Sequence, residues 1–212
     1  MRICFLNHNV NPATGAGRFG ANLVERLCRA DPALEVMVLT TRGSGHPGER
    51  ALLPANWLSL AFALPEIRRH FRECDIIHAL DGYPYGVIAA IALIGIRRPL
   101  IITAIGTGAV QPLYRWHGWA LAWAYRRARR IVAISSYTRR EILGKVPDVA
   151  IDVVNHAVDA AEFRGDPMAG LSESEKSEIE KSKPYVLTVG GWKRRKGFQY
   201  SSNFQVAQSA LE

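Results

Sequence analysis

Residues 15–20, GAGRFG, stand between an apolar run at Ile3–Leu6 and the helical pattern ANLVERLCRA of residues 21–30. A glycine-rich turn that joins a strand to a helix is typical of α/β domains in which the first amides of the helix hold a phosphate group. In a dinucleotide site the first glycine follows the strand almost directly, whereas about eight loop residues come between them here. This spacing predicts a strand–loop–helix unit with room for a phosphorylated or polyhydroxylated ligand larger than a dinucleotide.

The second expected strand also helps to decide whether the chain binds a dinucleotide. It covers Glu35–Leu39 and is followed by Thr40, Thr41 and Arg42, not by the acidic residue that binds the ribose of NAD. An arginine at this place suits the 2′-phosphate of NADP. An NADP-dependent oxidoreductase therefore remains an alternative function.

Strand-like and helix-like segments alternate along most of the chain. Apolar strands that are each followed by a helix predict βαβ units, and therefore an α/β fold with a parallel sheet and helices on both faces. Ligands of such sheets bind at the carboxyl ends of the strands. The expected strands are Arg2–Leu6, Glu35–Leu39, Asp75–Ala79, Leu100–Ala104, Ile131–Ile134, Ala150–Val154 and Tyr185–Val189, and the expected helices are Arg18–Arg29, Pro65–Glu73, Tyr85–Leu93, Gln111–Ala128 and Tyr137–Lys145.

The composition is that of a globular protein with anionic partners. Of 212 residues, 48% are hydrophobic and 22% are charged, and the net charge of +8 favours nucleotides, phosphorylated lipids, a membrane surface or nucleic acid. No nucleic-acid motif is present, so we expect no nucleic-acid partner. The longest apolar run, Val87–Ile96, is too short to span a bilayer and predicts a buried helix. Three separate cysteines in apolar patterns predict reduced thiols in a cytoplasmic protein, and the histidines lack metal-ligand spacing, so we expect no metal.

The composition changes at Gly165–Pro184, which is rich in Ser, Glu and Lys. Such a stretch has little to bury, so it predicts a linker with a short solvated helix over residues 172–181. A new strand is expected at Tyr185–Val189, but the 28 residues after Pro184 are too few for a domain. We therefore expect the chain to stop just inside a second domain, and to be inactive by itself. We expect the segment after Pro184, which lacks the rest of its sheet, to be disordered, to dock on an exposed sheet edge, or to be exchanged between two copies in a dimer.

Six short motifs occur in order along nearly the whole chain. Together they resemble those of the family-four retaining glycosyltransferases of the GT-B fold. The motifs are Gly15–Gly20; DIIHA at residues 75–79; PLIIT at residues 99–103 with Gly106; ARRIVAIS at residues 128–135; HAVD at residues 156–159 with Phe163; and Val189–Gly190 followed by Lys196–Gly197.

The resemblance implies two Rossmann-like domains on either side of a cleft. Residues 1–164 would form the N-terminal, acceptor-binding domain, residues 165–184 the linker, and residues 185–212 the start of the donor-binding domain. The donor would be a nucleotide-diphosphate sugar and the acceptor an envelope-type or lipid-linked glycan, with no cofactor or metal. Helix N-termini and cationic side chains stabilise the leaving diphosphate in such enzymes. The implied donor contacts are Gly15, Gly17, Arg18 and Lys196. Gly191 stands where the family has an arginine, and Lys193 or Arg195 is expected to compensate for it.

The acceptor side departs from the family pattern. Leu80 stands where many members have a second histidine, and Asp81 follows it. Asp81 is our candidate for a hydrogen bond to the acceptor hydroxyl, and it is equally suited to cap the next helix. His78 is a second catalytic candidate, although an apolar strand also suits a core histidine. Further acceptor-side candidates are Gly106 and Ser135, of which Ser135 also suits a helix cap.

The segment Gln111–Arg130 has two interpretations. Trp116, Trp119 and Trp123 fall on one face of the expected helix, which is usually a face that packs on the sheet. An aromatic face beside Arg126 and Arg127 is also how interfacial helices meet anionic lipid, which would place the protein peripherally at the inner face of the membrane. A non-catalytic anion- or membrane-binding module is accordingly another alternative function. The sequence leaves open the sugar, the nucleotide base, the acceptor and the oligomeric state.

Overall fold

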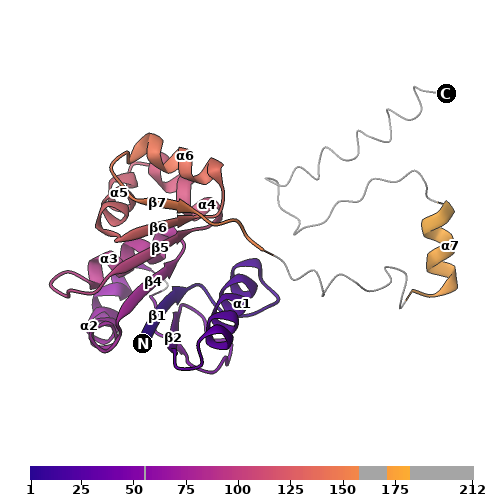
Figure 1. The fold of residues 1–212 in the computed structure, drawn as a ribbon, viewed down its shortest axis with the longest axis horizontal. Helices are drawn as coiled ribbons and strands as arrows, with labels where there is room; N and C mark the ends of the chain where they lie inside the picture. Colours follow the sequence, from indigo (N-terminus) through magenta and orange to yellow (C-terminus); the bar gives the residue numbers. More distant parts are fainter. Residues whose placement is uncertain (55, 158–170, 182–212) are drawn as a thin grey trace. The chain divides into compact units, whose positions relative to one another are not determined.

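The computed structural model describes residues 1–54, 56–157 and 171–181 (Figure 1). They fall into two units, Met1–Ala157 and a second unit that begins at Val158. The described part of the second unit contains helix α7 (Glu173–Lys181), which confirms the short helix expected over residues 172–181. Ser172 precedes it and bonds the carboxylate of Glu175 in the first turn. The strand expected at Tyr185–Val189, and with it Lys193 and Lys196, lies outside the described residues.

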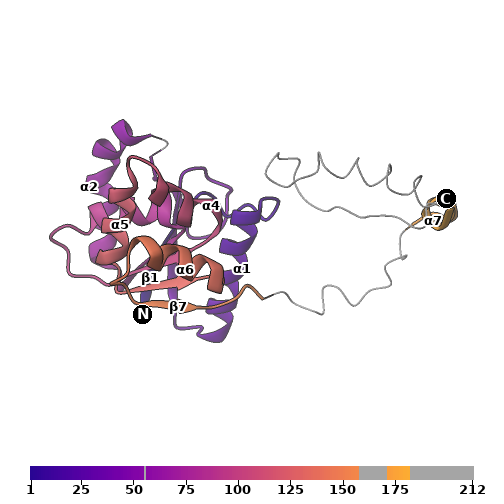
Figure 2. The same ribbon diagram turned by 90° about the horizontal axis from the view of Figure 1, so that it is seen from above.

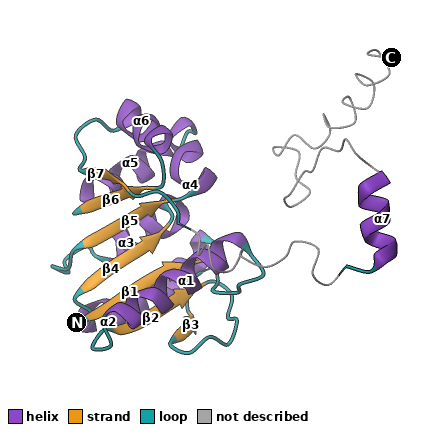
Figure 3. Cartoon of the chain, turned by 45° about the vertical axis from the view of Figure 1, so that its right-hand side comes forward, coloured by secondary structure: helices purple, strands orange, loops and turns teal. Residues whose placement is uncertain are grey.

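The first unit is built on a seven-stranded parallel sheet with the order β3-β2-β1-β4-β5-β6-β7 (Figure 3). Six strands confirm the expected ones, and all pairings are parallel. Strand β3 was not expected because its three residues are mostly polar and show no apolar run; it lies beside β2 at the edge. The strands are β1 (Arg2–Asn7), β2 (Glu35–Thr40), β3 (Glu49–Ala51), β4 (Ile76–Leu80), β5 (Leu100–Ala104), β6 (Arg130–Ala133) and β7 (Ile151–Val153).

Helices cover both faces of this sheet, which confirms a Rossmann-like α/β fold. Helix α1 packs on one face, while α2, α3, α5 and α6 contribute to the core on the other. Figure 2 shows α1 apart from α2 and α5. The helical elements are α1 (Gly15–Ala30), α2 (Trp57–Glu73), a π-type turn η1 (Gly82–Gly86), α3 (Val87–Ala92), α4 (Gly106–Val110), a 3-10 turn η2 (Gln111–Tyr114), α5 (Gly118–Arg127) and α6 (Ser136–Lys145).

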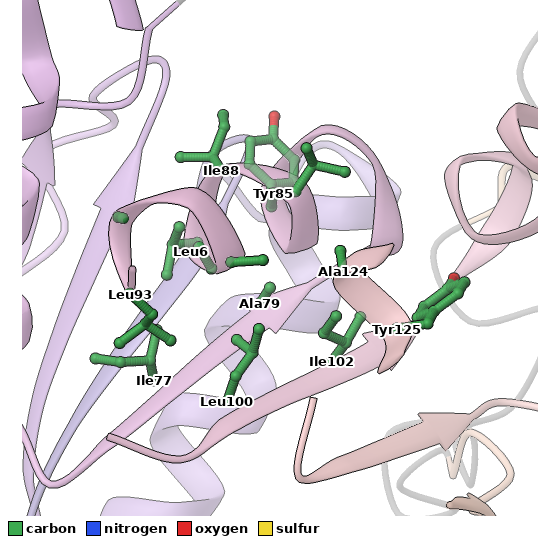
Figure 4. Packing of buried hydrophobic residues seen from close by; sticks show 14 of the residues in the cluster. Leu6, Ile77, Ala79, Tyr85, Ile88, Leu93, Leu100, Ile102, Ala124 and Tyr125 are labelled. Carbon is green, nitrogen blue, oxygen red and sulfur yellow. The ribbon is translucent and has the colours of Figure 1, made fainter. Parts of the chain in front are cut away.

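The larger core lies between the sheet and the helices α2, α3 and α5. Leu6, Ile77 and Ile102 project from the three central strands toward α3 and α5, where Ile88 and Tyr125 meet them (Figure 4). The apolar run that the sequence predicts to be a buried helix is α3, whose residues are nearly all buried. No helix among the described residues is long and apolar enough to cross a membrane.

Two helix boundaries differ from the expected ones. Helix α2 begins at Trp57, eight residues before Pro65, where the sequence suggested a start. Asn56 caps it by accepting a hydrogen bond from the Ser59 N–H at 2.9 Å. The proline removes one backbone bond, but the 17-residue helix still buries Leu60, Ile67 and Phe71, which outweighs that loss.

The helix expected over Gln111–Ala128 is broken into η2 and α5. The break occurs at Gly118, where a Cβ atom would lie 2.6 Å from the carbonyl oxygen of Leu113. Trp116 therefore lies in the turn before α5 and does not share a helical face with Trp119 and Trp123. Trp116 is 89% exposed and Trp119 71% exposed. The interpretation of these tryptophans as a core face is wrong, because α5 buries Leu121, Ala124 and Tyr125 instead.

Candidate functional site

The candidate site lies at the carboxyl edge of the sheet, where β1 and β4 are neighbours. The chain runs from β1 outward to β2 on one side, and from β4 outward to β7 on the other. In open α/β sheets this reversal of strand order leaves a crevice at which ligands bind. His8 follows β1, and Asp81 follows β4. The sequence predicted Asp81 at this edge but did not single out His8.

The loop after β1 is held by polar side chains of its own. The buried Asn7 donates from Nδ2 to the carbonyl oxygens of Asn9 (2.9 Å) and Ala16 (3.1 Å). The Asn9 Oδ1 accepts from the N–H of Asn11 and from the hydroxyl of Thr14, each at 2.9 Å. These bonds fix the point at which α1 begins, so the start of the helix is positioned by the loop beneath it.

Helix α1 begins at Gly15, and the side chain of Thr14 caps it. The Thr14 Oγ1 accepts a hydrogen bond from the Gly17 N–H at 3.1 Å, so this amide already has a partner. Gly17 is helical and has no positive φ; a Cβ there would collide with Asn9 Oδ1 and the Asn11 carbonyl oxygen. Close packing, not backbone conformation, therefore requires glycine at this position.

Two amides at the start of α1 have no hydrogen-bond partner among the described residues. They belong to Gly15 and Ala16, since the next two N–H groups bond to Thr14. Both residues are exposed, and a Cβ on Gly15 would have no atom within 4 Å. Arg18 folds its guanidinium back over the same loop and donates to the Pro12 carbonyl oxygen at 3.0 Å. This end of a 16-residue helix thus offers two free N–H groups and a nearby positive charge, which suits an anion.

Asp81 is held in a strained and half-buried position after β4. Its φ of 141° is rare for any residue with a side chain, and such strain is concentrated at functional sites. The Oδ1 atom accepts from the Gly82 N–H at 2.7 Å, which confirms the predicted cap. Burial raises the pKa of Asp81 to about 7, although the N–H groups of Gly82 and Ile105 act in the opposite direction. The carboxyl group therefore exists in both protonation states near neutral pH.

Gly108 lies against Asp81, and two tyrosines lie close enough to be affected by its charge. A Cβ on Gly108 would collide with Asp81 Oδ2, so the carboxylate lies directly against α4. Burial and the charge of Asp81 raise the pKa values of Tyr85 and Tyr125. The Tyr85 hydroxyl lies 3.1 Å from His8 Nδ1, which connects the ends of β1 and β4. His8 and Tyr85 were missed by sequence reasoning; the only signal is that each stands just after a strand, as Asp81 does.

The remaining predicted residues have clear local roles. The His78 Nε2 lies 2.7 Å from the hydroxyl of Thr103 on β5, and burial lowers its pKa to about 4. It is thus a neutral, hydrogen-bonded histidine of the sheet, on the face that α1 covers. Ser135 caps α6 by accepting from the Thr138 N–H at 3.1 Å. Gly106 begins α4 with a φ of 59°, a conformation that favours glycine, and has open space where a Cβ would stand.

One contact brings the end of the first unit to α1. The ring of His156 stacks on Phe19 with centroids 4.5 Å apart, so the chain after β7 returns toward the glycine-rich helix. His156 opens the HAVD motif, whose last two residues, Val158 and Asp159, lie outside the described part. In the described residues, no three His, Cys, Asp or Glu side chains lie together as metal ligands would.

The strand order and the helices on both faces define the first unit as an α/β domain of the Rossmann-like class. The family is shown by sequence: residues 13–162 match the family model described as Glycosyltransferase Family 4, and the chain belongs to that family. A comparison with curated proteins finds no match.

Solved structures share the fold at low sequence identity. Anabaena Alr3699/HepE in complex with UDP-glucose matches with a TM-score of 0.63 and 17% identity over 85% of this chain and 49% of that one. The lipopolysaccharide outer core galactosyltransferase WaaB in its apo form matches with a TM-score of 0.53 and 16% identity over 75% and 46%. A UDP-N-acetylglucosamine 2-epimerase matches with a TM-score of 0.55 and 13% identity, over 84% of this chain and 54% of that one. The chain spans about half the length of each of these proteins.

Proposed function

We propose that this chain is the acceptor-binding half of a retaining glycosyltransferase. The enzyme transfers a sugar from a nucleotide-diphosphate sugar to an envelope-type or lipid-linked acceptor. The family supports sugar transfer, and the complex of HepE with UDP-glucose supports the class of donor. The single observation that carries the acceptor role is Asp81, a strained carboxyl group with a pKa near 7 at the carboxyl end of β4, beside β1.

Each part of the crevice has a role in this proposal. Asp81 bonds the acceptor hydroxyl that attacks the sugar, and its raised pKa suits a group that accepts or returns a proton near neutral pH. The free amides of Gly15 and Ala16, with Arg18, contact the donor diphosphate from one side. Lys193 and Lys196 contact it from the donor domain. Gly106 lies beside the acceptor, whereas the hydroxyl of Ser135 is used as a cap.

The proposal is tested with a protein that continues through the donor domain. A panel of nucleotide-diphosphate sugars is assayed with a polyprenyl-phosphate-linked glycan as the acceptor, and release of nucleoside diphosphate is measured. Proton NMR of the product is expected to show the anomeric configuration of the donor. Asp81→Asn is expected to lower kcat/KM for the acceptor at least tenfold, about 1.4 kcal/mol, with the donor KM unchanged.

The control is Asp152→Asn, which removes the same charge from an exposed position on β7 and is expected to leave kcat/KM unchanged. Transfer at full rate by residues 1–212 alone would contradict the proposal that they form only one half of the catalytic unit. NADPH oxidation without sugar transfer would favour the oxidoreductase alternative, in which Arg42 binds the 2′-phosphate. Salt-sensitive binding to any polyanion without transfer would favour the non-catalytic module.

We also propose a peripheral contact of this unit with the inner face of the membrane. Trp116 just before α5 and Trp119 in its first turn are exposed, and Arg126 and Arg127 lie in its last turn. Indole rings at the headgroup level and arginines near anionic lipid both favour such binding. Trp116→Ala together with Trp119→Ala is expected to weaken binding to phosphatidylglycerol vesicles at least tenfold, measured by sedimentation.

The control for the membrane contact is Tyr137→Ala, which removes an exposed ring from α6. It is expected to leave vesicle binding unchanged. Equal losses in the two proteins would mean that no particular face meets the lipid. An exchange of the C-terminal segment between two copies stays a prediction, which the mass of the protein in solution tests.

A further inference from the structure

A hollow lies at the amino-terminal edge of the sheet, at the opposite end of the strands from His8 and Asp81. Its volume is about 590 Å³. The residues that line it include four arginines, Arg97, Arg98, Arg127 and Arg129, and we call these four residues the arginine pocket. Apolar side chains form the rest of its wall: Leu93, Ile96, Pro99 and Leu100.

The arginines meet because β5 and β6 are parallel neighbours. Arg97 and Arg98 precede the start of β5, and Arg127 and Arg129 precede the start of β6. The Arg129 N–H donates to the Leu100 carbonyl oxygen at 2.8 Å, which extends the pairing of the two strands to this edge. Two segments that lie about 30 residues apart in sequence therefore place their side chains around one hollow.

Two of the four guanidinium groups are fixed by backbone carbonyl groups. Arg127 donates from Nη2 to the Leu93 carbonyl oxygen at 2.8 Å, and Arg98 donates from Nη2 to that of Arg72 at 3.0 Å. Arg68 donates to the carbonyl oxygens of Ala92 and Ile94, each at 2.7 Å. The carboxyl end of α3 is therefore already matched by Arg68 and Arg127. A purely structural role in complementing this helix end does not explain the other arginines.

The charge of the pocket is largely uncompensated. Carbonyl oxygens orient a guanidinium but carry no formal charge. The Arg97 and Arg129 side chains make no hydrogen bond or ion pair with any residue that the structure describes, and both residues are exposed. The carboxylate that pairs with a member of the pocket is Asp75, whose Oδ1 lies 3.9 Å from Arg98 Nη1 while its Oδ2 accepts from the Arg2 N–H. Among the described residues, four positive charges are thus paired with one carboxylate.

We infer that the arginine pocket binds a phosphate group. A planar guanidinium donates two parallel hydrogen bonds to phosphate oxygens, and two of these groups are held in place before any ligand arrives. The apolar wall suits a phosphate ester with a carbon skeleton. The phosphate belongs either to a free phosphorylated compound or to the headgroup of an anionic lipid. The pocket is separate from the donor diphosphate of the proposed reaction, which lies at the other edge of the sheet.

The test compares two double variants that remove equal charge. Arg97→Ala with Arg129→Ala takes away the two unpaired guanidinium groups of the pocket. Arg139→Ala with Arg140→Ala removes two exposed arginines from α6. Binding of glycerol 3-phosphate is measured by calorimetry, and binding of phosphatidylglycerol or phosphatidylcholine vesicles by sedimentation, all at 150 mM salt. Thermal unfolding checks that both variants keep the fold.

The wild-type chain is expected to bind at least one of the two phosphate probes. The pocket variant is expected to weaken that binding at least tenfold, and the α6 variant less than twofold. Binding of glycerol 3-phosphate identifies a free phosphate ester as the ligand, and binding of phosphatidylglycerol vesicles alone identifies a lipid headgroup. Equal losses in the two variants, equal binding to both kinds of vesicle, or no binding to either phosphate probe would overturn the inference. None of these readouts depends on sugar transfer.

Discussion

Gly17→Ala is expected to lower the free energy of unfolding by about 3 kcal/mol, at the upper end of the usual cost of overpacking. The added Cβ would lie within 3 Å of three oxygen atoms, those of the Asn11 carbonyl, the Asn9 side chain and the Thr14 hydroxyl. These atoms also hold the loop and cap α1. The methyl group therefore displaces the loop and disrupts the cap. Urea unfolding followed by circular dichroism measures the loss.

The matched control is Gly15→Ala, two residues earlier in the same turn of helix. A Cβ there meets no atom within 4 Å, and alanine favours a helix over glycine. We expect this variant to be as stable as the wild type or more stable. Equal destabilisation by the two substitutions would show that glycine is needed for the backbone and not for close packing.

Asp81→Asn is expected to remove a pH-dependent loss of stability. The pKa of Asp81 is about 7 in the folded chain and 3.8 in the ordinary reference state, so the folded chain holds this proton more tightly. The wild type therefore loses free energy of unfolding as the pH rises from about 4 to about 7, by roughly 2–4 kcal/mol for a half-buried group. Asparagine keeps the shape without ionising. The difference between the two proteins, measured by urea unfolding at several pH values, should grow across this window.

His78 changes the pH dependence of stability in the opposite direction to Asp81. The stability of Asp81→Asn is therefore compared with that of the wild type at each pH. Its pKa is lowered to about 4, so the chain loses stability as the pH falls from about 6.5 to 4. Both proteins contain His78, and its contribution cancels when one pH profile is subtracted from the other. Profiles that stay parallel from pH 4 to pH 8 would mean that Asp81 is solvated and not held in a low-dielectric crevice.

Much of this fold could be predicted from the sequence because burial leaves a clear pattern in parallel strands. Six strands of mainly Val, Ile, Leu and Ala were found, and their alternation with helices predicted the parallel sheet. Strand β3 was not predicted, because an edge strand of three residues need not be apolar. Asp81 was found because the carboxyl end of a strand is where such sheets bind ligands.

The parts that could not be predicted depend on contacts between distant segments. That Trp119 is exposed and Tyr125 buried follows from how α5 lies on the sheet, and an aromatic pattern is compatible with either face. Position 17 requires glycine because the preceding loop packs against it, and this contact cannot be read from the glycine motif. The link between His8 and Tyr85 joins residues 77 positions apart.

The central place of β1 has a consequence for how the chain is made. β1 pairs with β2 on one side and with β4 on the other, although β4 comes almost 70 residues later. During synthesis, residues 1–40 can leave the ribosome and pair, but one edge of β1 stays open until residues 76–80 follow. At about 5–20 residues per second, this interval is roughly 2–8 s. Until β4 is made, the unpaired N–H and C=O groups along this edge of β1 stay open to pairing with another chain.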